Sequence, residues 1–211
     1  MNIYSDGEWL SWIDSLSEKD YVVIDQFLPN DLYDLIQHFF KEKLSHNDFK
    51  KSGIGSVYNN QIIENIRGDF TFWIDKKRDV EIHQFFELIE EAKNKLNRYC
   101  YLSLSGYEFH LAHYPKGSFY KRHLDQFNNR SNRMITMIVY LNENWKTGDG
   151  GELKIYKNDT EICVEPLANR CILFKSILLE HEVLSTNVGR NSLTGWFLYQ
   201  PSGVGYILGN N

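Results

Sequence analysis

The chain has 211 residues, 42% of them hydrophobic and 24% charged, a composition typical of an ordinary globular protein and not of a disordered or fibrous one. The 23 basic and 28 acidic residues leave a net charge of −5, and no segment concentrates Lys and Arg as a nucleic-acid groove requires, so we expect no nucleic-acid partner. No apolar run approaches the ~18 residues that would cross a bilayer, and the first ten residues lack the pattern of a signal peptide, so we expect one cytoplasmic domain over 1–211 with no membrane partner.

Helical periodicity dominates the first hundred residues. A helix is predicted over 6–16 with its N-cap at Asp6, because apolar residues recur at helical spacing: Trp9, Trp12, Ile13 and Leu16. Similar apolar stripes predict helices over 31–44 and 80–99. Between the first two helices, the β-branched and aromatic residues of 21–27 predict a strand.

After Cys100 the pattern changes to short strand-like runs separated by turn signals. Strands are predicted at 107–114, 119–125, 133–141, 152–156, 161–166, 170–175 and 193–199. The glycine-rich stretch 147–151 is interpreted as a hairpin turn. We therefore expect a mainly β protein with flanking α-helices, built from a helical N-terminal support over about 1–100 and a β core over about 101–200.

Cysteines can form disulfides or bind zinc, and histidine pairs can bind metals, but in this sequence neither group has the spacing that such sites require. The cysteines lie far apart without a CxxC pair, so we expect neither a disulfide nor a zinc site and interpret all three as buried thiols: Cys100, Cys163 and Cys171. His110 and His113 are three residues apart in a predicted strand, where that spacing points side chains to opposite faces. We interpret this histidine pair as structural.

A better metal site is formed by His123 and Asp125, which share one face of a strand because they are two residues apart. Taken alone, this pair is more often a surface histidine beside a solvated aspartate. His181 supplies a third ligand from a strand expected to return across the same sheet, and two imidazoles with one carboxylate suit Fe(II). Arg190 then follows, where its guanidinium could bind a dicarboxylate cosubstrate in a two-pronged geometry.

Four segments carry a resemblance to a known family: HYPKGSFYKRHLD, IVYLNENW, GGELKIY and HEVLSTNVGRNSLTGWF. They resemble the catalytic core of the Fe(II)- and 2-oxoglutarate-dependent prolyl hydroxylases, a group that includes animal hypoxia-sensing enzymes and bacterial relatives. The match covers about 105–200, and upstream IRGDFTFWI is similar to an Arg-Gly-Asp segment of that family that ends in Trp. The resemblance implies a double-stranded β-helix core of the jelly-roll, cupin-like kind, with helices outside.

The resemblance also implies cofactors and the residues that hold them. Fe(II), 2-oxoglutarate and O2 are expected, with ascorbate as a candidate reductant. The metal ligands would be His123, Asp125 and His181, which form the catalytic set together with Arg190. The arginine would bind the distal carboxylate of 2-oxoglutarate in a pocket lined by aromatic residues: Tyr114, Tyr140 and Trp196. Read singly, such aromatic residues would more often pack a β core.

The implied reaction is that of a dioxygenase of prolyl 4-hydroxylase type, acting on a prolyl residue in a protein. By resemblance to the bacterial members of the family, elongation factor Tu is the first candidate substrate. Arg67, Asp69 and Trp73 are implied on the substrate side, with a loop over about 45–64 folding across a bound peptide. The alternatives are a ribosomal protein, a small molecule such as a free amino acid, or a non-catalytic binding module of the same fold. Arg67 and Asp69 could also be an exposed ion pair of little energetic value.

Overall fold

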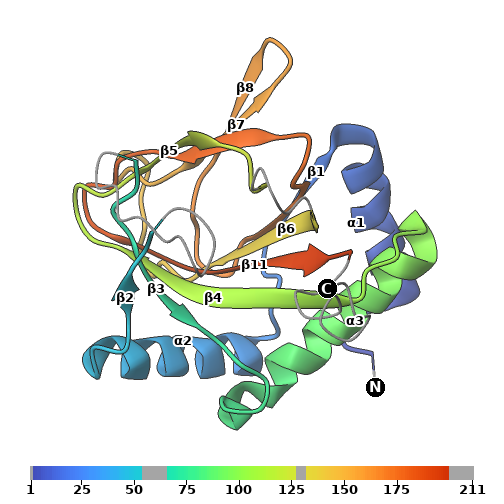
Figure 1. Ribbon diagram of the computed structural model, residues 1–211, viewed down its shortest axis with the longest axis horizontal. Helices are drawn as coiled ribbons and strands as arrows, with labels where there is room; N and C mark the ends of the chain where they lie inside the picture. The colour runs from blue at the N-terminus through green and yellow to red at the C-terminus, as the bar shows by residue number, and fades with distance from the viewer. Residues whose placement is uncertain (1, 54–65, 127–131, 200–211) are drawn as a thin grey trace, which may run out of the picture.

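The computed structural model describes residues 2–53, 66–126 and 132–199 (Figure 1). The helices of this part are α1 (Asp6–Lys19), α2 (Asn30–Ser45) and α3 (His83–Cys100), the last preceded by a short 3-10 turn, η1 (Val80–Ile82). Residues 54–65, which include most of the loop predicted to cover a peptide, lie outside the described part. Residues 50–51, predicted within that loop, instead form a two-residue strand.

The described strands form two antiparallel sheets. The larger sheet has the spatial order β1 (Tyr21–Ile24), β9 (Cys171–Lys175), β6 (Arg133–Tyr140), β11 (Arg190–Leu198), β4 (Gly106–Tyr114), β3 (Phe70–Trp73) and β2 (Lys50–Lys51). The smaller sheet has the order β5 (Tyr120–His123), β10 (Glu180–Val183), β7 (Leu153–Lys157) and β8 (Thr160–Val164). In Figure 1 the helices α2 and α3 lie beneath the larger sheet and the smaller sheet lies above it. The mainly β, jelly-roll fold expected from the sequence is confirmed.

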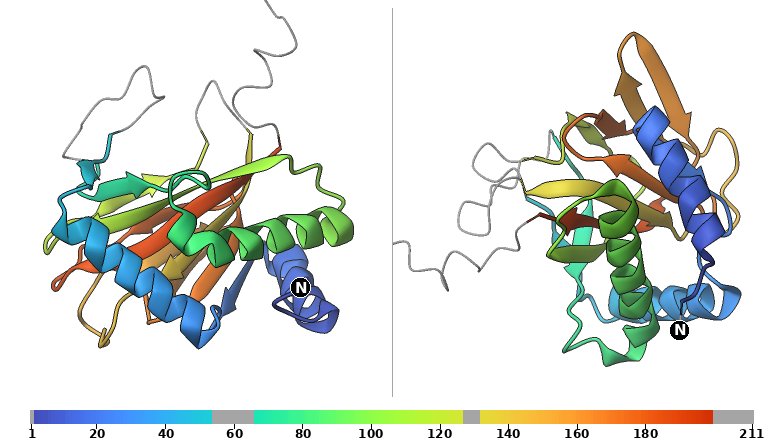
Figure 2. Two further views of the ribbon diagram at one scale, coloured as in Figure 1. Left: turned by 90° about the horizontal axis from the view of Figure 1, so that it is seen from below. Right: turned by 90° about the vertical axis from the view of Figure 1, so that its right-hand side faces the viewer.

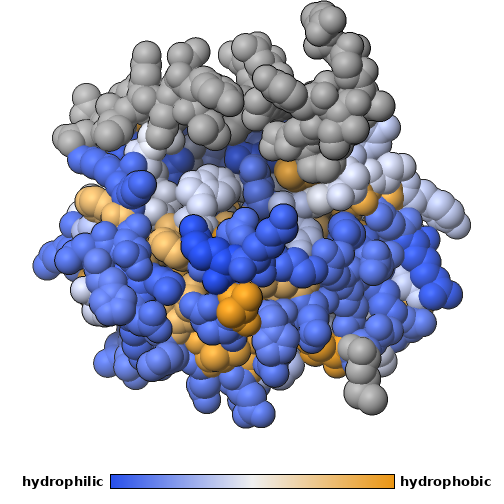
Figure 3. Space-filling view, turned by 60° about the horizontal axis from the view of Figure 1, so that its bottom comes forward, coloured by the Kyte–Doolittle hydropathy of each residue, from blue (hydrophilic) through white to orange (hydrophobic). Residues whose placement is uncertain are grey.

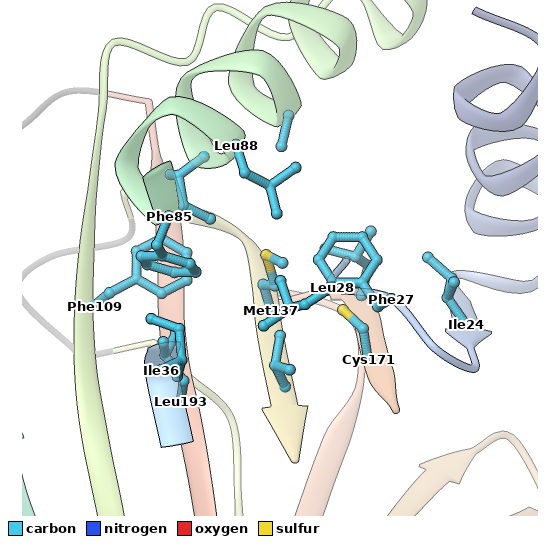
Figure 4. Close-up of a cluster of buried hydrophobic side chains, with 14 of the residues drawn as sticks. Ile24, Phe27, Leu28, Ile36, Phe85, Leu88, Phe109, Met137, Cys171 and Leu193 are labelled. Carbon is cyan, nitrogen blue, oxygen red and sulfur yellow. The ribbon is translucent and has the colours of Figure 1, made fainter. Parts of the chain in front are cut away.

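Alternation along the strands of the larger sheet divides its side chains between two cores. One face packs against the helices, and Figure 2 shows them covering that face. Figure 4 shows Met137 and Leu193 of the sheet in this cluster together with Ile36 of α2 and Phe85 of α3. The opposite face carries a second apolar cluster shared with the smaller sheet, including Tyr140, Ile155 and Phe174. The space between the two sheets is therefore partly filled by side chains, and polar residues within it are buried.

Helix α1 begins one residue earlier than its predicted cap implies. The N-cap is Ser5, which forms a capping box: its Oγ accepts from Glu8 N at 3.3 Å, and its own N donates to Glu8 Oε2 at 2.8 Å. Asp6, the predicted N-cap, instead forms an ion pair with Lys95 of α3. The prediction at Asp6 was wrong because the capping box needs Glu at the third helical position, a requirement that Ser5 meets and Asp6 does not.

The predicted hairpin at 147–151 is also wrong. This stretch connects β6 to β7, which belong to different sheets and do not pair. Its glycines are needed for a tight crossing: Gly150 has φ +76°, and a Cβ there would lie 2.2 Å from Ser185 O. A turn signal in sequence marks the reversal of the chain, but it does not say whether the next strand joins the same sheet.

Two further expectations change with the structure. Of the three cysteines only Cys171 is buried, whereas Cys100 is half-buried and Cys163 is exposed on β8. The N-terminal part contains the strand predicted within 21–27, which is β1, and also two strands that were not predicted, β2 and β3, and all three join the larger sheet. The extension of one domain over 1–211 stays a prediction.

The face that carries the helices is mainly hydrophilic, with hydrophobic side chains only in small patches (Figure 3). No helix in the described part of the chain is both long and apolar enough to cross a membrane.

Candidate active site

His123, Asp125 and His181 meet between the two sheets. His123 ends β5 and is the register partner of His181 in β10, while Asp125 follows β5 two residues later. His123 Nε2 lies 3.4 Å from Asp125 Oδ1, and His181 Nε2 lies 3.6 Å from Asp125 Oδ2. The three ligand atoms all lie within 4.8 Å of one another, close enough to hold a single metal ion.

Backbone carbonyls select the tautomer of both histidines. His123 Nδ1 lies 2.7 Å from Lys121 O, and His181 Nδ1 lies 3.1 Å from Leu179 O. A carbonyl oxygen can only accept, so each Nδ1 carries a hydrogen, and Nε2 is the ring nitrogen that faces Asp125. Burial lowers the pKa of His181 to about 4, which keeps it neutral at pH 7. Both rings therefore have the orientation that a metal ligand needs, and His181 is also in the neutral form.

The surroundings of Asp125 keep its carboxylate in the anionic form that a metal ligand requires. It is almost fully buried, and its Oδ2 accepts a hydrogen bond of 2.8 Å from Thr136 Oγ1 of β6. Burial alone would raise the pKa of Asp125, but its interactions with His181, His123 and the Arg133 cation outweigh burial and hold the pKa below its usual value. Two imidazoles and one carboxylate form the 2-His-1-carboxylate set of mononuclear iron oxygenases, so the residues fit Fe(II).

A second polar centre lies at the start of β11. Arg190 is only 1% exposed, and its guanidinium carbon lies 4.9 Å and 5.0 Å from the ring centroids of Tyr114 and Tyr140. Its Nη1 donates to Ser192 Oγ at 3.3 Å. Nε and Nη2 have no hydrogen-bond partner in the described part of the chain, and neither does the Tyr140 hydroxyl. Burial raises the pKa of Tyr140, so this hydroxyl remains a donor.

Burying a cation whose N–H groups lack hydrogen-bond partners costs free energy unless an anion binds to it. Among the described residues no carboxylate forms an ion pair with Arg190, and Gly151 leaves room beside it, since a Cβ there would lie 3.2 Å from Arg190 Cδ. Two guanidinium donors and the Tyr140 hydroxyl together suit one carboxylate group. These donors therefore fit the distal carboxylate of 2-oxoglutarate.

Trp196 takes part in an aromatic stack further along the same strand. Its ring lies 5.4 Å from that of His110, and Arg133 Cζ lies 3.5 Å above it. Trp73, which is half exposed, lies over His110 at 4.8 Å. The structure thus brings Trp196 together with Trp73, while its place in the 2-oxoglutarate pocket stays a prediction. His110, interpreted from sequence as structural, is buried in this stack, and its alternation with Tyr114 along β4 was the signal for its inward position.

Arg67 and Asp69 form a buried pair and not an exposed one. Arg67 Nε and Nη2 donate to the two carboxylate oxygens of Asp69 at 2.7 Å and 2.6 Å, and Asp69 is fully buried. Ser52 Oγ donates to the same carboxylate at 2.9 Å. The alternative of a solvated surface pair is therefore excluded, whereas a role on the substrate side stays a prediction.

Comparison with known proteins agrees with this geometry. Residues 109–198 match the model of the 2OG-Fe(II) oxygenase superfamily. A solved prolyl-4-hydroxylase from Pseudomonas putida superposes with a TM-score of 0.83 at 32% identity, covering 91% of this chain and 99% of that one. The chain belongs to the 2OG-Fe(II) oxygenase superfamily and, within it, to the prolyl hydroxylases. The family, the dioxygenase class and the cofactors Fe(II), 2-oxoglutarate and O2 expected from the sequence are confirmed.

Two further relatives of this prolyl hydroxylase family member come from animals. A hypoxia-inducible factor prolyl hydroxylase of Caenorhabditis elegans is 27% identical over 199 residues, which cover 88% of the chain but only 27% of the nematode protein. A prolyl hydroxylase of Trichoplax adhaerens, solved in complex with a hypoxia inducible factor oxygen degradation domain peptide fragment, has a TM-score of 0.82 at 24% identity. The superposition covers 92% of this chain and 90% of the Trichoplax chain. At 24% identity, this similarity shows a shared fold.

Proposed function

We propose that the protein is an Fe(II)- and 2-oxoglutarate-dependent dioxygenase that hydroxylates a prolyl residue in a protein. The observation that carries this proposal is the buried Arg190 with unpaired donors, beside a His-Asp-His group in the tautomeric state of a metal site. A metal site alone would suit several reactions. The combination with a carboxylate receptor is what a dicarboxylate cosubstrate requires.

Each residue then has a role in the proposed site. His123, Asp125 and His181 hold the metal, and the Lys121 and Leu179 carbonyls keep the imidazoles in position. Arg190 and Tyr140 bind the distal carboxylate of 2-oxoglutarate, with Tyr114 and Trp196 as further walls of the pocket. When bound, Fe(II) supplies the oxygen chemistry that protein side chains lack. The protein contributes ligand geometry, orientation and exclusion of water.

The proposed substrate is a prolyl residue of elongation factor Tu, with a ribosomal protein as the second candidate. Trp73, 47% exposed beside the buried Trp196 and His110, offers an apolar surface next to the site that a prolyl ring could contact. The Trichoplax relative was solved with a peptide, which supports a protein substrate. Arg67 and Asp69 remain proposed on the substrate side, ascorbate remains a proposed reductant, and a cytoplasmic location remains a prediction linked to this substrate.

One experiment separates the candidate functions. The purified protein is incubated with Fe(II), 2-oxoglutarate and purified elongation factor Tu, and succinate release is measured while tryptic peptides are searched for a gain of one oxygen at proline. His181→Ala serves as the inactive control. Oxygen gain in elongation factor Tu supports the proposal. Succinate release stimulated by free amino acids but by no protein favours the small-molecule alternative, and failure to bind 2-oxoglutarate favours a binding module.

A further inference from the structure

A stack of side chains connects Arg67 to the proposed metal ligand His123. The rings of His123 and Tyr120 are nearly parallel, with centroids 3.7 Å apart and an interplanar angle of 18°. Arg67 Cζ lies 4.4 Å from the centroid of the same Tyr120 ring. Two groups this close to one centroid have room only on opposite faces, so the phenol ring is held between the guanidinium and the imidazole. We call Arg67, Tyr120 and His123 the Arg67 stack.

The N–H groups along the edge of the Arg67 guanidinium are engaged in hydrogen bonds. All three guanidinium nitrogens donate: Nε and Nη2 to Asp69, and Nη1 to Gly53 O at 3.3 Å. Asp69 is buried and is further bound by Ser52 Oγ. With its edge engaged in this way, the guanidinium acts on its surroundings mainly through its flat face. That face covers Tyr120, where a cation over an aromatic ring is attracted to it.

The backbone of the same segment borders the strand that carries His123. Gly68 N donates to Phe119 O at 3.0 Å, and Lys121 N donates to Ile66 O at 2.9 Å, so the two hydrogen bonds flank Tyr120. β5 is an edge strand of only four residues, and its pairing with β10 contains a register irregularity. The Arg67 segment therefore supports the free edge of the strand from which His123 projects.

The two proposed histidine ligands differ in how they are supported. His181 lies on β10, an inner strand, with a side chain 5% exposed and packed against Phe174 at 4.8 Å. His123 lies at the end of the edge strand, and its side chain is 18% exposed. The hydrogen bond to Lys121 O restrains the imidazole within its plane, and stacking on Tyr120 restrains its tilt. His123 is thus the ligand whose orientation depends most on neighbours outside the metal group.

We propose that Arg67 and Tyr120 are positioning residues for the metal ligand His123, with Arg67 acting on the imidazole through Tyr120. This inference rests on the proposed function, because it presupposes a metal at His123, Asp125 and His181. The stack fixes the imidazole with Nε2 towards Asp125 before metal arrives. Partners that orient metal ligands typically change metal affinity by about 10- to 100-fold when they are removed.

Metal affinity of the apoprotein tests the proposal without using activity. Co(II) is titrated into each variant, and binding is followed by calorimetry and by the visible absorption of the bound ion, which reports ligand geometry. Tyr120→Leu removes the stacking ring, and Tyr120→Phe is the control that keeps it. Arg67→Met combined with Asp69→Asn removes the cation and its counter-ion together, so no lone charge is left buried.

The chain offers a matched control for the double variant. Arg78 donates through Nε and Nη2 to Asp79 at 2.8 Å and 2.7 Å and lies 4.7 Å from the Phe72 centroid, but it does not contact the Arg67 stack. Arg78→Met with Asp79→Asn therefore removes a pair with the same two-pronged hydrogen bonding over a different ring, although the Arg78 side chain is 55% exposed and that of Arg67 only 15%. A general loss of stability would affect both double variants alike, whereas loss of ligand positioning affects only one.

The expected result is about 10-fold weaker Co(II) binding with an altered absorption spectrum in Tyr120→Leu and in the Arg67–Asp69 double variant. Tyr120→Phe and the Arg78–Asp79 double variant should stay within about two-fold of the parent protein. Parent-like Co(II) affinity in folded Tyr120→Leu overturns the inference, and the comparison of Leu with Phe at position 120 decides the matter even where the double variant fails to fold. Absence of Co(II) binding in the parent protein would instead contradict the proposed function itself.

Discussion

His123 and His181 are register partners across β5 and β10, and their ring centroids lie 4.4 Å apart. Since side chains alternate along a strand, a shift of one residue in this pairing would turn one imidazole to the opposite face of the sheet. The proposed metal site therefore depends on strand register as much as on the identity of its ligands.

Replacing His181 with Ala should abolish metal binding and 2-oxoglutarate turnover while the fold is kept. One of the three ligand atoms is lost, and the remaining pair gives too few donors to hold the ion. Mn(II) titration with circular dichroism of the same samples checks this. His113→Ala is the control, because His113 is bound to Asn191 and lies on the opposite face of β4 from Tyr114. Parent-like metal affinity in His181→Ala would show that the ion binds elsewhere.

Replacing Arg190 with Lys should weaken 2-oxoglutarate binding and leave metal binding unchanged. Lysine keeps the charge but lacks the planar guanidinium that binds both carboxylate oxygens. The binding free energy of 2-oxoglutarate should therefore weaken by about 1 to 3 kcal/mol. The KM for 2-oxoglutarate in the uncoupled reaction measures the effect. Arg98→Lys, which alters an arginine packed over Tyr99 near the end of α3, should keep the parent KM. An unchanged KM in Arg190→Lys would assign the carboxylate to another residue.

The stability of the metal-free protein should fall in acid partly because of His110. Burial lowers its pKa from 6.5 to about 3, so the unfolded chain takes up a proton that the folded chain does not. The unfolding free energy should therefore be unaffected by His110 above about pH 6.5 and decrease as the pH falls from there towards 3. The slope from this group approaches about 1.4 kcal/mol per pH unit.

Urea unfolding between pH 4 and pH 7 tests this titration. His110→Phe keeps a planar ring in the stack with Trp73 and Trp196 but cannot take up a proton. Its unfolding free energy should depend less steeply on pH than that of the parent protein. Parallel pH profiles for the two proteins would mean that His110 does not remain neutral in the folded state.

Gly195→Ala should destabilise the protein, whereas Gly7→Ala should not. A Cβ at Gly195 would lie 2.2 Å from Phe109 Cδ1 and 2.4 Å from Glu108 O, so the large sheet must shift, at a cost of about 1 to 3 kcal/mol. At Gly7, in the first turn of α1, the nearest atom to an added Cβ is Ser5 Oγ at 3.9 Å, and alanine favours the helix. Thermal unfolding of the two variants gives the comparison, and equal melting temperatures would contradict it.

The sequence alone determined the features that depend on neighbours along the chain. The two-residue spacing of His123 and Asp125, the opposite faces of His110 and His113 on β4, and the helical stripes of α2 and α3 all follow from local geometry. The resemblance to prolyl hydroxylases could be read because its motifs occur in order within the β region, and the family is confirmed. Two predictions were wrong because they depend on which residues a segment contacts. The N-cap of α1 is Ser5, and the turn at 147–151 leads to a strand of the other sheet.

Only the tertiary structure decided which groups complete the site. The carbonyls of Lys121 and Leu179 that select the histidine tautomers are groups every residue possesses, so no sequence signal distinguishes them. The same holds for the contact of Arg67 with Tyr120, which exists because 66–68 pairs with the edge of β5. Such contacts join segments far apart in sequence, and they are fixed by strand pairing and burial, which depend on the whole fold and not on the spacing of residues within one segment.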